Sequence, residues 1–111
     1  MNLKKGVIVG DIKPAIWYAI GIAEIIWRDL GRSLVVTSLR DGEHITDSLH
    51  YKGLAADFRT RDMTDAEKSK AFLRLKLTLD DMGYDVILEK DHAHVEFDPK
   101  PQDNPWQTYV E

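Results

Sequence analysis

The chain has 111 residues, of which 43% are hydrophobic and 31% are charged. This length and balance fit one globular domain, and they exclude both two independent cores and global disorder. Nineteen acidic against fifteen basic residues give a net charge of −4 without a basic stripe, which disfavours a nucleic-acid partner. The chain contains no cysteine, which excludes disulfides and thiolate metal ligands.

The amino-terminal residues do not resemble a targeting signal. Their apolar run, Val7 to Val9, is too short for the core of a signal peptide. The longer apolar stretch at 15–27 includes Glu24 and falls short of a membrane span. We therefore expect a monomeric protein that is made in the cytoplasm without a membrane span. It would act on a substrate outside the cytoplasm only after release by another agent.

The first predicted element is a helix. Pro14 is suited to its first position, Gly31 to the position after its end, and the apolar residues between them recur at helical spacing. Apolar residues cover much of its circumference, so we expect it to be largely covered. Trp17 and Trp27 are then packing residues of the core or its rim rather than a ligand platform.

The rest of the chain predicts strands and one further helix. A capping box, Thr64 with Glu67 three residues later, begins this helix, and Gly83 ends it. The pattern of helices beside a small, mainly antiparallel sheet indicates an α+β domain with its helices on one side. We expect strands at 33–39, 54–58, 85–90 and 93–97, the last two as a hairpin, with a polar loop at 40–48 and an irregular extension of the same domain at 99–111.

All four histidines fall in two places, His44 with His50 and His92 with His94. Because side chains alternate along a strand, His92 and His94 would share one face, where two imidazoles are costly unless something binds them. His50, with Asp57 seven residues later, could supply the other half of a zinc site, since zinc takes imidazole and carboxylate ligands. Each half alone is explained more simply by ordinary surface residues.

The two halves together resemble a known family. "SLHYKGLAADF" and "EKDHAHVEF" resemble the zinc peptidases of the M15 type, which are D-Ala-D-Ala carboxypeptidases, dipeptidases and L-alanyl-D-glutamate endopeptidases that act on bacterial cell-wall peptides. The same stretch resembles the amino-terminal signalling domain of hedgehog proteins, which share this zinc fold without needing its hydrolysis. The pattern S-x-H-x-x-G-x-A-x-D is met by Ser48, His50, Gly53, Ala55 and Asp57, and the late H-x-H by His92 and His94.

The resemblance implies a role for each motif residue. His92 would stabilise the oxyanion that develops on the attacked carbonyl. Asp91, three residues before the last ligand, is the first choice for the general base, and Glu89 is the reserve. The ligands of one zinc ion per chain would be His50, Asp57 and His94.

Arg40 and Ser48 are assigned to substrate binding. Arg40 stands where these peptidases often carry an arginine, and a guanidinium can bind a C-terminal carboxylate or a D-glutamate side group with two parallel hydrogen bonds. A surface ion pair of Arg40 with Asp41 or Glu43 remains equally open. Gly53 would permit the tight turn between His50 and the next strand.

Two functions follow from the resemblance. The first is a zinc metallopeptidase that cuts D-amino-acid-containing peptides of peptidoglycan, as a carboxypeptidase or an endopeptidase, for example in a phage endolysin. Zinc would lower the pKa of its bound water to about 7, and Asp91 would take the proton of that water. The alternative is a non-catalytic, zinc-stabilised binding domain of the hedgehog kind. Retention of Asp91 and Glu89 favours the enzyme.

Overall fold

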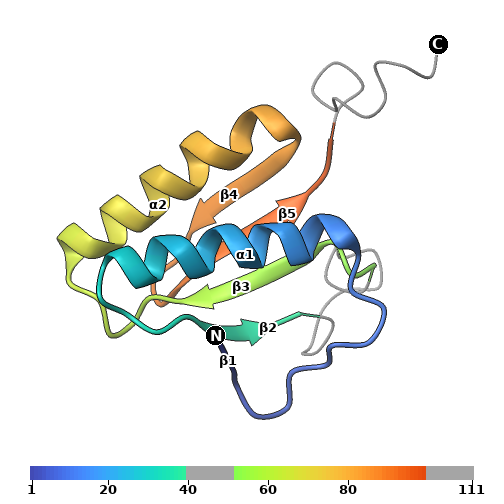
Figure 1. The fold of residues 1–111 in the computed structure, drawn as a ribbon, viewed down its shortest axis with the longest axis horizontal. Helices are drawn as coiled ribbons and strands as arrows, with labels where there is room; N and C mark the ends of the chain where they lie inside the picture. Colours follow the sequence, from blue (N-terminus) through green and yellow to red (C-terminus); the bar gives the residue numbers. More distant parts are fainter. Residues whose placement is uncertain (40–51, 100–111) are drawn as a thin grey trace.

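The computed structural model describes residues 1–39 and 52–99, which form one five-stranded sheet and two α-helices. Both helices cover the same face of the sheet (Figure 1), so the α+β class predicted from the sequence is confirmed. The elements are β1 (Asn2–Leu3), α1 (Pro14–Asp29), β2 (Val35–Ser38), β3 (Ala55–Arg59), α2 (Asp65–Leu79), β4 (Tyr84–Leu88) and β5 (His92–Phe97), and a 3-10 turn, Asp80–Met82, follows α2.

The strand order in the sheet is β1-β2-β3-β5-β4. Strands β4 and β5 form the predicted hairpin, and β3 lies between β2 and β5, antiparallel to both. The sheet is mixed rather than antiparallel throughout because β1 pairs with β2 in parallel. The sequence did not predict β1, since two residues show no periodicity. The predicted loop at 40–48 and the extension after Pro99 lie outside the described residues.

Helix α1 has the predicted ends. Pro14 occupies its first turn, and its last carbonyls are satisfied by backbone hydrogen bonds from Gly31 to Arg28 (2.9 Å) and from Arg32 to Trp27 (2.9 Å). This is a Schellman motif, and Gly31 supplies its left-handed residue with φ of 73°. Trp27 is buried edge-on against Phe58, at a centroid distance of 6.0 Å. Trp17 lies on the surface, with 43% of its area exposed.

Helix α2 begins with the predicted capping box. The Thr64 hydroxyl accepts from the Glu67 backbone N–H (3.1 Å), and the Glu67 carboxylate accepts from the Thr64 N–H (2.9 Å). The same carboxylate receives two hydrogen bonds from Arg32, at 2.8 and 3.0 Å, which tie the start of α2 to the end of α1. The Arg32 hydrogen bond lowers the pKa of Glu67 to about 2, and the capping bond adds to the effect.

The core lies between the helices and the sheet. Ala56 and Phe58 of β3, with Ala93 and Val95 of β5, are fully buried under the helices, where large apolar side chains contribute roughly 1.5–3 kcal/mol each. No helix in the two described ranges is long and apolar enough to cross a bilayer.

Because strand side chains alternate, the residues of β3 and β5 that lie between these buried positions project from the opposite face of the sheet. This face, called the polar face, carries Asp57, Arg59, His92, His94 and Glu96.

Candidate functional site

Two of the predicted zinc ligands lie side by side on the polar face. Asp57 of β3 and His94 of β5 are direct partners in the strand register. Asp57 Oδ1 lies 2.7 Å from His94 Nδ1, although the residues are 37 positions apart in the sequence. Their side chains are only 13% and 18% exposed. The fold therefore joins one residue of each sequence motif in a partly buried contact.

The other ring nitrogen of His94 contacts Glu96, which lies two residues further along β5. The distance from Nε2 to Glu96 Oε1 is 2.8 Å. The hydrogen bond with Asp57 raises the pKa of His94, the bond with Glu96 adds to it, and burial opposes both. Carboxylates accept hydrogen bonds, so both contacts are hydrogen bonds when the ring carries a proton on each nitrogen; a metal ion bound at Nδ1 would replace the bond to Asp57 while Nε2–H still donates to Glu96. Metal-binding histidines are commonly oriented by a carboxylate in this way.

Asp91 and His92 form a second carboxylate–imidazole pair at the start of β5. Asp91 Oδ1 lies 2.7 Å from His92 Nδ1, and His92 Nε2 lies 4.0 Å from Asp57 Oδ1. The hydrogen bond with His92 lowers the pKa of the exposed Asp91 carboxyl. His92 therefore turns one nitrogen toward Asp91 and the other toward the first pair.

The described donors fit a zinc ion. Ligands at about 2.0–2.2 Å from a tetrahedral ion lie about 3.3–3.6 Å apart. The contact between Asp57 and His94 would have to open by less than about 1 Å to reach this spacing. One carboxylate oxygen and one imidazole nitrogen also match the ligand types of catalytic zinc. The predicted third ligand, His50, and the predicted substrate residues Arg40 and Ser48 lie outside the described residues.

A polar hollow of about 240 Å³ adjoins these two pairs. Asp57, Asp91 and His92 contribute to its lining. Glu89 is exposed and is not among the described residues that line the hollow. Of the two acids predicted as a base, Asp91 is therefore the one that faces this space.

Four residues of the site were missed at the level of the sequence. Glu96 contacts His94, and three basic side chains, Lys4, Arg59 and Arg61, also line the polar hollow. Strand alternation could have identified Glu96, two residues after His94, and Arg59, two residues after Asp57. Lys4 carries no such signal, because it follows a strand of two residues.

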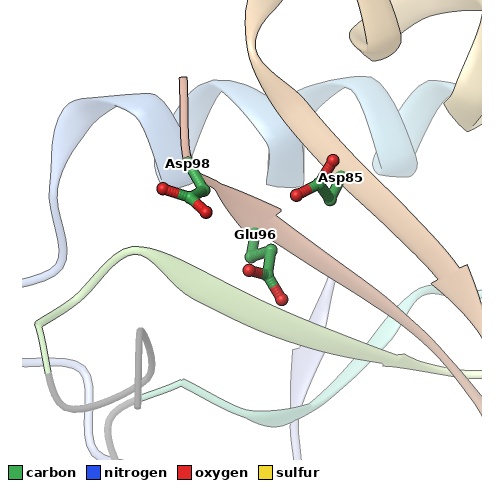
Figure 2. A group of neighbouring side chains, drawn as sticks. All are labelled: Asp85, Glu96 and Asp98. Atoms are coloured by element: carbon green, nitrogen blue, oxygen red, sulfur yellow. The ribbon is translucent and has the colours of Figure 1, made fainter. Parts of the chain in front are cut away.

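An acidic cluster lies further along the polar face (Figure 2). Asp85 of β4 pairs in register with Glu96 of β5, Asp98 follows that strand, and one carboxylate oxygen of each lies within 4.8 Å of the others. Within residues 1–39 and 52–99, this is the only group of three or more potential metal ligands at that spacing. Exposed carboxylates often cluster without an ion, so the cluster by itself is no evidence of a metal site.

Comparison of the chain with protein-family models, curated proteins and solved structures finds no match.

Proposed function

We propose that this chain is a zinc-dependent peptidase of the hedgehog-like zinc fold that hydrolyses D-amino-acid-containing peptides of bacterial peptidoglycan. It would act as a carboxypeptidase or as an endopeptidase, for example in a phage lytic enzyme. The observation that carries this proposal is the 2.7 Å contact between Asp57 and His94. Two motifs that resemble the same peptidase family thus contribute one partly buried donor each to a single place on the sheet.

His50, Asp57 and His94 would hold the ion. A bound zinc ion supplies an acidified water and polarises the scissile carbonyl. Glu96 keeps the His94 ring in one orientation by accepting a hydrogen bond from Nε2. The register of β3 and β5 makes Asp57 and His94 direct neighbours, so only a small opening of their contact would be needed to admit the ion.

Asp91 is the proposed general base. An exposed aspartate is ionised at neutral pH, so its carboxylate can accept a proton from water and return it to the leaving amine. Asp91 lines the polar hollow, whereas Glu89 does not, and this difference supports Asp91 over Glu89.

His92 is the proposed stabiliser of the oxyanion. Its Nδ1 is taken by Asp91, which leaves Nε2 as the nitrogen that can reach a substrate oxygen. When Nδ1–H donates to Asp91, donation from Nε2 to a substrate oxygen requires a ring that carries a proton on both nitrogens. Its interaction with a developing negative charge would be strongest in the transition state.

Digestion of purified peptidoglycan tests the proposal against the alternative, a non-catalytic zinc-stabilised binding domain. The zinc-loaded chain should release new amine termini, a chelator should abolish the release, and mass spectrometry of the muropeptides should identify the bond. A chain that holds one zinc ion and releases no amine termini would contradict an enzymatic function.

The variants Asp91→Asn and Glu89→Gln test the assignment of the base. Asp91→Asn should lower turnover by about 10²–10⁴-fold without loss of zinc, because removal of a general base has this effect. Glu89→Gln is the matched control, since Glu89 is an exposed acid two residues away. The opposite pattern of losses would transfer the role to Glu89.

A further inference from the structure

The polar hollow beside Asp57 gathers three cations from two separate parts of the chain. Lys4 follows β1, Arg59 is the last residue of β3, and Arg61 follows that strand. Arg59 is half-buried, whereas Lys4 and Arg61 are exposed. Within the described part of the chain, the side chains of these residues make neither an ion pair nor a hydrogen bond.

The acids of the hollow are already engaged with imidazoles. Asp57 contacts His94 and Asp91 contacts His92, each at 2.7 Å. Three cations therefore share about 240 Å³ with two carboxylates that have other partners. Like charges in one small space repel each other, and a bound divalent cation would increase the positive charge there.

We propose that Lys4, Arg59 and Arg61 form a binding subsite for a carboxylate of the substrate. This inference rests on the proposed function and specifies its substrate class, namely peptides with an acidic group close to the cleaved bond. The planar guanidinium fork of arginine matches a carboxylate with two parallel hydrogen bonds. The hollow is smaller than the roughly 300–1,000 Å³ of pockets that enclose a whole ligand, so it suits one group of an extended peptide.

The position of Arg59 limits where that carboxylate lies. Arg59 is two residues beyond Asp57 on β3 and is the register partner of His92. Two strand residues span about 7 Å, which is also about the length of two residues of an extended peptide. The carboxylate is thus placed one or two residues from the bond that is cut. A terminal carboxylate and the free carboxylate of a D-glutamate residue both satisfy this spacing.

Hydrolysis of synthetic stem peptides tests this subsite in the full, zinc-loaded chain. Peptides with all carboxylates free are compared with peptides amidated at the terminus or at the D-glutamate carboxylate. Arg59→Gln and Arg61→Gln should each lower kcat/KM by about tenfold or more on the free peptide. In the wild type, amidation of the bound carboxylate should lower kcat/KM by the same factor, and amidation of the other position should not. The two arginine variants should show no further decrease in kcat/KM on the peptide that is amidated at the bound carboxylate.

Lys70→Gln is the matched control, since Lys70 is an exposed cation on α2, away from the polar face. Equal losses on free and amidated peptides, or no loss in either arginine variant, would overturn the subsite. Arg61 is exposed, so its variant keeps the test valid even if Arg59→Gln misfolds.

A binding measurement separates failure of the subsite from failure of the proposed function. The probes are N-acetyl-D-alanine and its amide, titrated into the wild type and Arg61→Gln and followed by NMR. Binding of the acid but not the amide, weakened about tenfold in Arg61→Gln, supports the subsite even if no peptide is cut. Equal affinity of wild type and Arg61→Gln for the acid would contradict it, even in an active peptidase.

Discussion

Replacing Gly53 by alanine tests how the first sequence motif is held in the fold. Gly53 has φ of 73°, and its carbonyl accepts a hydrogen bond from the Lys13 N–H (3.0 Å) at the start of α1. A Cβ at this position would meet the Asp11 carbonyl oxygen at less than 3.0 Å, closer than real Cβ atoms come. The neighbour is backbone, so it cannot turn aside as a flexible side chain could.

The expected cost has two parts. A left-handed conformation costs a residue other than glycine about 1–2 kcal/mol, and overpacking against backbone adds about 1–3 kcal/mol. Gly53→Ala should therefore lower the free energy of unfolding by about 2–5 kcal/mol. For a domain of this size, the corresponding decrease in Tm is roughly 8–20 °C.

Gly31→Ala is the matched control for this measurement. Gly31 has the same φ of 73°, but a Cβ there would have nothing within 4 Å, so it incurs only the conformational cost. Urea denaturation gives the free energy of unfolding of both variants, and the difference between the two values measures the contact with Asp11. Equal destabilisation of Gly53→Ala and Gly31→Ala would refute the close approach of the two segments.

Two further predictions concern the stability of the fold. Tyr84→Phe removes the hydrogen bond from the Tyr84 hydroxyl to the Ala15 carbonyl (2.8 Å), so the free energy of unfolding should fall by about 1 kcal/mol in urea; an unchanged value would show that this bond contributes nothing. The pKa of Glu67 is lowered from 4.5 to about 2, so its stabilising effect should be complete above about pH 4.5 and lost as the pH falls toward 2. The stabilities of wild type and Glu67→Gln, measured from pH 6 to pH 2, should therefore converge at the acid end, and a constant difference would contradict the role of the Arg32–Glu67 pair.

Much of the fold was predictable because its signals are local. Pro14 and Gly31 bound α1, and the Thr64–Glu67 capping box begins α2, because these residues satisfy backbone groups of their own helices. Strand β1 was not predictable, since its two residues are ordered by parallel pairing with β2 rather than by their own pattern. The exposure of Trp17 was also missed, because composition alone does not tell which side of an apolar helix faces the sheet.

The candidate site was predictable only where residues share a motif. The resemblance to a peptidase family predicted that Asp57 and His94 would serve one site, and the register of β3 and β5 places them in contact. Glu96 and Arg59 follow from strand alternation once the polar face is known. Lys4 reaches the hollow through tertiary structure, which no spacing in the sequence encodes.

The zinc content of the purified chain tests the central claim most directly. Native mass spectrometry should find one zinc ion per chain in the wild type and a loss of zinc in His94→Ala, because Asp57 and His94 are the donors that the sheet brings together. Asp85→Asn, which alters the acidic cluster, should keep its zinc. Full zinc content in His94→Ala together with loss in Asp85→Asn would place the ion at the acidic cluster and contradict the proposed site.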